Sequence, residues 1–200
     1  MTEDALKCRL RLVSNIVDED DILVSEAAKD KEAFAKLYDK YFSLVLGYIY
    51  HCVFNGTITE DLTSNVFLAA FRHIGRYKWR SIPFRAWLYR IATNEVRMYW
   101  RRQKLVTTVD QSEQNRRYES NAVSACDSAS ECEEYRMVHR ALLKLRIKYR
   151  TVIILRYFED KTIQQISEIT GKKEGTIKSQ LHRGLAELQD ILVRWGVLPE

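Results

Sequence analysis

A chain of 200 residues, 46% of them hydrophobic, can bury one core or two small ones. It has no run of the ~18 to 20 apolar residues that a bilayer span needs, and its N-terminus lacks the apolar segment of a signal peptide. The four cysteines, Cys8, Cys52, Cys126 and Cys132, form no C-x-x-C pair, which argues against a zinc site. We therefore expect a cytoplasmic protein without membrane insertion, metal or cofactor.

The net charge of +5 is arranged in alternating blocks. Residues 72–104 contain 10 Lys/Arg and 1 Asp/Glu, a net charge of +9, and residues 135–200 have a net charge of +6. The segments before them, 1–71 and 105–134, each have a net charge of −5. Clustered cations attract a polyanion through counterion release. Each basic block is a candidate nucleic-acid-binding surface, with an ordinary solvated face as the alternative.

Apolar residues recur at helical spacing through most of the chain, and only two prolines interrupt it, which predicts an all-α fold. A long helix is predicted from an N-cap at Asp30 to about Cys52. Asn55-Gly56 predicts a turn. Thr59 is the expected N-cap of the next helix, which runs from Glu60 to about Ile74.

Residues 75–82 are predicted to form a loop, and Pro83 favours the first turn of a third helix that continues to about Lys104. Apolar periodicity then disappears as far as about Ser130, in a polar segment typical of a linker. Four further helices are predicted at about 132–145, 148–158, 162–170 and 174–195. The expected division is an N-terminal extension at 1–18, a first domain at 19–104, a linker at 105–131 and a second domain at 132–200.

Residues 162–185 have the pattern of a helix-turn-helix, in which a short amphipathic helix precedes a longer one. Small Ser167 lets the helices approach, and Gly171 can adopt the positive φ of the turn. The second helix has an apolar face that is predicted to pack, made of Ile177, Leu181, Leu185, Leu188 and Leu192. Its opposite face is polar, as major-groove reading requires, with Lys178, Ser179, His182 and Arg183. A plain helical hairpin can show the same spacing.

Cations alternate with aromatic residues through the first basic block. A helical wheel places Leu88, Ile91, Ala92, Val96 and Tyr99 on one face, and Arg90, Asn94, Arg97 and Arg101 on the other. Aromatic rings beside guanidinium groups suit stacking on unpaired bases. The loop residues Arg76, Tyr77, Lys78, Trp79 and Arg80 are therefore candidates for base contacts, whereas Trp87 is interpreted as a core residue.

The chain resembles the extracytoplasmic-function sigma factors of bacterial RNA polymerase over about Asp20 to Leu192. Five segments carry the family's motifs in the family's order: 32–41, 60–72, 84–94, 149–160 and 175–183. The resemblance implies a region 2-like helical bundle and a region 4-like helix-turn-helix domain, joined by a flexible linker. It also implies a non-enzymatic initiation factor that binds core RNA polymerase and promoter DNA, and the family is commonly controlled by an anti-sigma protein.

The resemblance assigns roles to three sets of residues. The clamp helices of the largest polymerase subunit would contact Asp61, Leu62, Ser64, Asn65, Phe67 and Phe71, while the second domain would meet the polymerase flap region. The −10 element would be bound and melted by Arg76, Tyr77, Lys78, Trp79 and Arg80, with Arg90, Asn94, Arg97 and Arg101. The −35 element would be read by Lys172, Lys173, Thr176, Lys178, Ser179, His182 and Arg183, with Arg150 near phosphates together with Lys172 and Lys173.

The chain departs from the family pattern at Ser64-Asn65, where relatives usually have Gln-Glu or Gln-Asp. This difference bears on how strongly the chain would dock on the clamp. A conventional helix-turn-helix repressor or activator is the alternative function, although it would leave residues 60–71 and the loop at 76–81 without a role. A recombinase or nuclease would need clustered carboxylates, and Glu95 is the only carboxylate in the first basic block.

Overall fold

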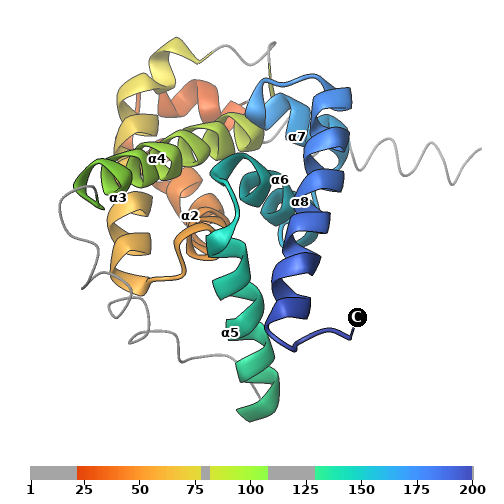
Figure 1. Ribbon diagram of the computed structural model, residues 1–200. Coiled ribbons are helices and arrows are strands. Elements are labelled where there is room, and N and C mark those ends of the chain that lie inside the picture. The colour runs from red at the N-terminus through yellow and green to blue at the C-terminus, as the bar shows by residue number, and fades with distance from the viewer. Residues whose placement is uncertain (1–21, 78–81, 108–128, 200) are drawn as a thin grey trace, which may run out of the picture.

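The computed structural model describes residues 22–77, 82–107 and 129–199, and confirms the predicted all-α fold. No strand occurs among these residues. A helical turn at 22–27 precedes the labelled elements (Figure 1), which are α2 (Lys31–Val53), α3 (Gly56–His73), the 3-10 helix η1 (Ile74–Arg76), α4 (Phe84–Thr107), α5 (Ala129–Lys144), α6 (Ile147–Tyr157), α7 (Ile163–Thr170) and α8 (Glu174–Arg194). Most of the expected linker and all of the 1–18 extension lie outside the described residues.

Helix α2 begins at the predicted cap. The Asp30 carboxylate accepts hydrogen bonds from the backbone N–H groups of Glu32 and Ala33, at 3.1 and 3.3 Å. These bonds satisfy donors that have no partner within the first turn of a helix. The apolar face of α2 is buried at every turn, at Leu37, Tyr41, Val45, Tyr48 and Ile49. This face forms the centre of the first domain.

The predicted start of α3 was wrong by four residues. Asn55 is the N-cap, because its side-chain oxygen accepts from the N–H of Ile58 at 3.0 Å. Thr59, the expected cap, is only 2% exposed, and its hydroxyl donates to the Asn55 carbonyl at 2.7 Å. The residue before Asn55, Phe54, has a φ of 51° and reverses the chain at the end of α2. Asn55 was read as a turn residue because Asn-Gly pairs favour turns, but the same side chain also favours a helix start.

Helix α4 begins beside Pro83, as predicted. The Pro83 carbonyl accepts from the N–H of Trp87 at 3.0 Å, so the proline stands at the helix start, where its missing N–H costs nothing. The helix then continues to Thr107, three residues beyond Lys104. Trp87 is partly buried against Phe84 and Tyr77, in agreement with its interpretation as a core residue.

The helix-turn-helix has the predicted local geometry. Thr162 and Gln165 form a capping box at the start of α7, and each side chain bonds the backbone N–H of the other residue. Gly171 ends α7 with a φ of 68°, the left-handed conformation that glycine adopts at little cost. Ile166 and Ile169 are buried beneath the turn. These features fix the angle at which α8 leaves α7.

The packed face of α8 differs from the predicted one at three positions. Leu185 is 37% exposed, whereas Gly184 and Ile191 are buried. A Cβ atom at Gly184 would lie 3.0 Å from Ile153 Cδ1 and 3.0 Å from Tyr149 Cβ. Helices α6 and α8 therefore approach closely at Gly184. The apolar periodicity could not reveal this contact, because glycine has no side chain to count.

Gly184→Ala is expected to lower the free energy of unfolding by about 1 to 2 kcal/mol, because the new methyl group overlaps Tyr149 Cβ, which is fixed to the α6 backbone. Gly175→Ala on the same helix is the control. Nothing lies within 4 Å of the added methyl group at Gly175. Because alanine favours a helix more than glycine does, the free energy of unfolding is expected to rise by about 0 to 1 kcal/mol. Urea unfolding measures both, and equal effects at the two glycines would contradict the close helix approach.

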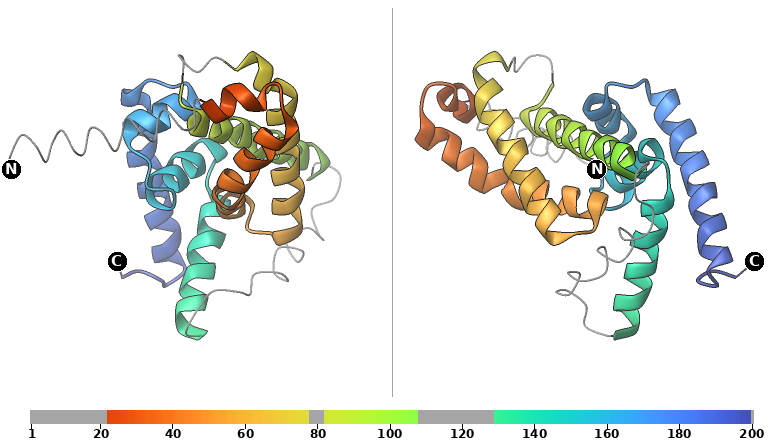
Figure 2. Two further views of the ribbon diagram at one scale, coloured as in Figure 1. Left: turned by 180° about the vertical axis from the view of Figure 1, so that it is seen from behind. Right: turned by 60° about the vertical axis from the view of Figure 1, so that its left-hand side comes forward.

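The two groups of helices pack against each other. Helix α4 lies against α2 and α3 on one side and contacts α6 and α7 on the other. Figures 1 and 2 show α4 between α2 and α3 on one side and the helix-turn-helix on the other. Helix α2 also meets α5 and α6. The predicted helix-turn-helix thus shares a packed interface with α4, which belongs to the first basic block.

Candidate nucleic-acid interface

One side of α8 has the exposure that a DNA-reading helix needs. Six predicted −35 residues are exposed, Lys173, Thr176, Lys178, Ser179, His182 and Arg183. Ile177 and Leu181, between them in the sequence, are buried and hold the helix to the domain. The arrangement leaves short polar and cationic side chains on the free side of a firmly packed helix. It can therefore place several donors against base edges at once.

Lys172 differs from its exposed neighbours. It is half-buried, and its ammonium group donates to the Gln180 side-chain oxygen at 2.9 Å. Burial lowers the pKa of Lys172, and the positive charges of Arg97 and Lys148 lower it further. Arg97 belongs to the other predicted DNA-binding surface. The sequence could not show that two surfaces so far apart in the chain would meet.

The predicted −10 surface is described only in part. On α4, Arg90, Asn94 and Arg101 are exposed and Arg97 is half-buried. The Arg90 guanidinium lies 3.4 Å from the position of a Cβ atom on Gly171, at the turn of the helix-turn-helix. Helix α7 therefore borders the cationic face of α4 in this arrangement.

The predicted loop ahead of α4 begins with the 3-10 helix η1, and Tyr77 follows as its C-cap. The Tyr77 hydroxyl donates to the Ile82 carbonyl at 2.6 Å, and the ring packs 5.0 Å from that of Trp87. Tyr77 is thus held in the domain rather than presented to solvent as a stacking platform, while Arg76 is exposed. Lys78, Trp79 and Arg80 lie outside the described residues. Their predicted role in base contacts stays a prediction.

The predicted polymerase-contact residues of α3 divide between surface and core. Asp61, Ser64, Asn65 and Phe71 are exposed. Leu62 and Phe67 are 7% and 5% exposed and pack in the core of the first domain, and their predicted contact with polymerase stays a prediction. A motif assigns residues by sequence position, whereas a helix turns only every third or fourth residue toward the same side.

An exposed apolar strip on α3 extends beyond the predicted residues. Leu68 is 46% exposed and Phe71 is 42% exposed, with the Phe71 ring 5.0 Å from that of Phe34 on α2. Leu68 follows Ser64 by four residues and precedes Phe71 by three, so helical spacing could have identified it. Large apolar side chains at the surface of a small domain commonly mark a site where a protein binds.

Arg150 was predicted to lie near DNA phosphates, but it is buried. It is 4% exposed, and its guanidinium donates to the carbonyls of Leu142, Leu143 and Leu145 near the end of α5 and to the carbonyl of Cys52 at the end of α2. Its carbon Cζ also lies 4.5 Å from the centre of the Trp100 ring. Arg150 is therefore a structural cation that caps α5 and joins it to the first domain.

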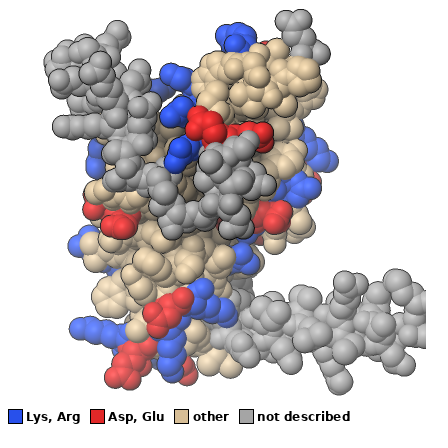
Figure 3. All heavy atoms as spheres, turned by 90° about the horizontal axis from the view of Figure 1, so that it is seen from below, with Lys and Arg blue, Asp and Glu red and all other residues tan. Residues whose placement is uncertain are grey.

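One further face of the described structure is mixed in charge. Figure 3 shows this face, on which Lys and Arg side chains lie near Asp and Glu side chains. Within the described residues, no group of three His, Cys, Asp or Glu side chains is placed to hold a metal ion, and no helix is long and apolar enough to cross a membrane. Cys52 is buried, which raises the pKa of its thiol to about 12.

The fold and these surfaces define an all-helical DNA-binding protein with a helix-turn-helix domain and a second basic domain. Residues 37–106 match the family description "Sigma-70 region 2", and residues 135–188 match "Sigma-70, region 4". The two matches coincide with the two groups of helices. The chain belongs to the extracytoplasmic-function (ECF) sigma factors of RNA polymerase, as its similarity to named members shows.

Two relatives illustrate the similarity. The ECF RNA polymerase sigma factor SigW of Bacillus subtilis is 31% identical over 167 residues, which cover 80% of this chain and 89% of SigW. The ECF RNA polymerase sigma factor BldN of Streptomyces coelicolor is 32% identical over 171 residues. That match covers 82% of this chain but only 62% of BldN.

Solved structures share the fold. CnrH, in complex with the cytosolic domain of CnrY, superposes with a TM-score of 0.65 at 23% identity, over 88% of this chain and 97% of CnrH. The sigma factor RpoE of Bartonella quintana, in complex with the anti-sigma factor NepR, gives a TM-score of 0.60 at 21% identity, over 80% of this chain and 96% of RpoE. Both support the two-domain helical architecture.

Proposed function

We propose that this chain is a cytoplasmic specificity factor for transcription initiation, which binds core RNA polymerase, recognises −10 and −35 elements and promotes DNA melting. The observation that carries the proposal is the pairing of two cationic surfaces on two domains of one family, one on α4 and one on α8. A factor that must hold a duplex at one point and open it at another needs two such surfaces.

The −35 element is the ligand of α8 in this proposal. Lys178 and Arg183 supply charged donors to base edges, and Ser179, Thr176 and His182 supply shorter polar contacts. Lys172 and Lys173, near the N-terminal end of α8, fix the register by binding phosphates. Lys172 must exchange its bond with Gln180 for a phosphate, so Gln180 positions the ammonium group before DNA arrives.

The −10 element is the ligand of the first domain. Arg90, Asn94, Arg97 and Arg101 on α4 bind the backbone of the separating strands, while Arg76 and the loop residues Lys78, Trp79 and Arg80 receive an extruded base. Extruding a base costs a few kcal/mol, which the duplex contacts of the second domain help to offset. This mechanism needs no covalent step by the chain.

Core polymerase is the partner of α3 in this proposal. Leu68 and Phe71 form the apolar centre of the docking surface, and Asp61, Ser64 and Asn65 form its polar rim. The second domain meets the polymerase flap region. An anti-sigma protein is a further proposed partner, because the sigma factor RpoE, which shares the fold, was found bound to the anti-sigma factor NepR.

Promoter binding with and without core polymerase tests the proposed function. The purified chain is expected to bind a duplex containing the −10 and −35 elements strongly and selectively only when core polymerase is present. Strong selective binding by the chain alone would support a conventional repressor or activator instead. Cleavage of the DNA would support a nuclease.

Phe71→Ala is expected to weaken the affinity for core polymerase by about 1 to 2 kcal/mol, because it removes an exposed aromatic anchor from the docking surface. The double variant Ser64→Gln, Asn65→Glu restores the family's usual residues on the same exposed strip, and a higher affinity is expected. Fluorescence anisotropy of the labelled chain with core polymerase measures both. Unchanged affinity in both variants would remove α3 as the docking surface.

A further inference from the structure

The interface between the two domains contains a pair of histidines. His51 lies near the end of α2 and His139 lies on α5, and the His51 Nδ1 and His139 Nε2 atoms are 3.0 Å apart. The two rings stack with centroids 5.3 Å apart. Phe54 stacks on His139 at 4.5 Å, and Phe158 packs against His51 at 4.6 Å. The pair is thus enclosed by aromatic rings from both domains.

The hydrogen bonds define which nitrogen carries each proton. The His139 Nδ1 atom lies 3.0 Å from the Tyr135 carbonyl, which can only accept, so this nitrogen must donate. A neutral His139 therefore has a bare Nε2, which accepts from the N–H at His51 Nδ1. When both rings are protonated, His139 Nε2 and His51 Nδ1 each carry an N–H, and the two donors face each other without an acceptor. The bond between the domains survives only while at least one of the two histidines is neutral.

The same interface covers part of the proposed −10 surface. Tyr89 on α4 donates to Glu159 at 2.5 Å, and Arg150 donates to the Cys52 carbonyl at 3.1 Å. Beside them, Arg90 borders Gly171, and Arg97 lies close enough to Lys172 to lower its pKa. When these contacts are made, α7 occupies space that DNA along α4 would need.

We propose that His51 and His139 form a proton-sensitive latch, which holds the two domains closed over the α4 surface when both rings are neutral and releases them in acid. The consequence for promoter DNA rests on the proposed function, whereas the latch itself is a property of the free chain. Burial and the charge of His139 lower the pKa of His51 to about 4, and burial lowers the pKa of His139. The closed arrangement therefore excludes the charged forms.

Acid favours the open state of the two domains. A histidine whose pKa is lower in the closed state stabilises that state fully above its ordinary value of 6.5, and this stabilisation is lost as the pH falls toward the lowered value. From about pH 7.5 to about pH 5.5, His51 alone should raise the open-to-closed ratio roughly tenfold. His139 acts in the same direction.

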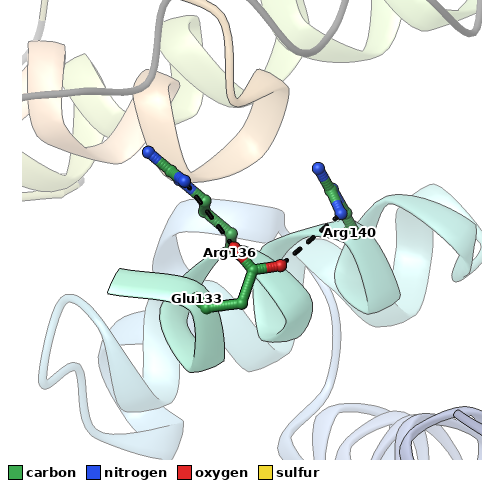
Figure 4. A network of polar contacts seen from close by, with 3 residues as sticks. All are labelled: Glu133, Arg136 and Arg140. Carbon is green, nitrogen blue, oxygen red and sulfur yellow. Dashed lines mark ion pairs between the residues drawn. The ribbon is translucent and has the colours of Figure 1, made fainter. Parts of the chain in front are cut away.

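Other charged groups lie near the pair. Arg150 on α6 donates to the carbonyl of Cys52, the residue that follows His51. On α5, Arg136 and Arg140 pair with Glu133 at 3.6 and 3.9 Å (Figure 4). Cys52 stays neutral, since burial raises the pKa of its thiol.

Glu159 and Lys161, which follow α6, complete this environment. Burial raises the pKa of Glu159 and lowers that of Lys161. Protonation of Glu159 favours the closed state, so Glu159 opposes the histidines as the pH falls. The net opening in acid must therefore come from the histidine pair.

Small-angle X-ray scattering of the full chain at about pH 7.5 and about pH 5.5, at equal ionic strength, tests the latch through the fraction of expanded molecules. The wild type should be compact at the higher pH and shift toward expanded molecules at the lower one, with unchanged helix content by circular dichroism. The variant His51→Asn, His139→Gln keeps amide groups near the two bonded nitrogens but cannot titrate. Its expanded fraction should not rise in acid.

Two single variants separate the latch from general loosening. Tyr89→Phe removes a bond between the domains and should raise the expanded fraction at both pH values, while Tyr48→Phe removes a bond to Thr93 within the first domain and should not. A wild type that is expanded at the higher pH, that keeps its dimensions in acid, or that loses helix as it expands would overturn the latch. So would acid expansion of the double histidine variant. Scattering requires neither polymerase nor DNA, so failure of the proposed function leaves this result unaffected.

Discussion

Arg150→Leu is expected to lower the free energy of unfolding by about 3 to 5 kcal/mol. The guanidinium is 4% exposed and donates to the carbonyls of Leu142, Leu143, Leu145 and Cys52. Leucine fills much of the same volume but leaves these buried acceptors without the donor, and each lost bond to a charged group costs about 1.5 to 3 kcal/mol before relaxation. The last turn of α5 should fray first, because the Leu142 and Leu143 carbonyls lose their guanidinium donor. The Leu142 carbonyl then keeps its bond from the N–H of Leu145, and the Leu143 carbonyl is left without its charged bond.

Arg156→Leu is the matched control for this prediction. Arg156 lies on the same helix α6, is exposed, and donates to the Lys161 carbonyl at 3.1 Å. Its replacement should cost about 1 kcal/mol or less. Arg150→Lys should recover little of the loss, since an ammonium group cannot reproduce the planar fork of donors. Urea unfolding compares the three, and similar losses at Arg150 and Arg156 would show that the buried network does not stabilise the fold.

Lys178→Ala and Arg183→Ala should each weaken promoter binding by the polymerase complex by about 1 to 3 kcal/mol, roughly 5- to 150-fold, if each side chain reads a base edge. Both side chains are exposed on α8, so the free energy of unfolding should stay nearly constant. A base-reading contact has a second signature. Its loss should relax discrimination at one base pair of the −35 element, whereas loss of a phosphate contact weakens all sequences alike.

Arg194→Ala supplies the control for charge. Arg194 is an exposed cation at the far end of the same helix, and its Nε donates to the Asp190 carbonyl. Its replacement removes one positive charge from α8 without touching the proposed reading face, so binding should change by less than about 0.5 kcal/mol. Competition binding with −35 variants at fixed salt measures all three variants. If Lys178→Ala and Arg183→Ala bind every −35 variant as the wild type does, this face of α8 does not read the element.

Local patterns predicted much of the fold. Asp30, Pro83 and Gly171 each act through their own backbone or immediate neighbours, and the structure confirms the role predicted for each. The start of α3 was missed because Asn55 can serve either a turn or a cap, and the choice depends on how Thr59 is buried against the rest of the domain. The residues next to Asn55 in the sequence do not decide between a turn and a helix N-cap, because the two conformations are similar in energy.

The exposed side chains of the candidate site could be predicted where exposure follows the helical period. They could not be predicted where a residue far away in the sequence covers or binds the side chain. The polar side of α8 was identified from period alone, as were the exposed cations of α4. Arg150 was misplaced because its acceptors are carbonyl groups, which leave no mark in a sequence. The contact of Arg90 with Gly171 joins positions that only the tertiary fold brings together.

Helix α4 packs on two sides, and this links promoter recognition to the packing of the two domains. One side of this helix is core for its own domain, and the other both faces α7 and provides the proposed −10 contacts. A substitution at Arg90 that altered promoter preference would also alter the fit against Gly171, where the positive φ disfavours any compensating side chain. Among related proteins, the promoter sequence that is preferred and the packing of the two domains should therefore change together. Substitutions on α4 should be accompanied by substitutions in the turn between α7 and α8.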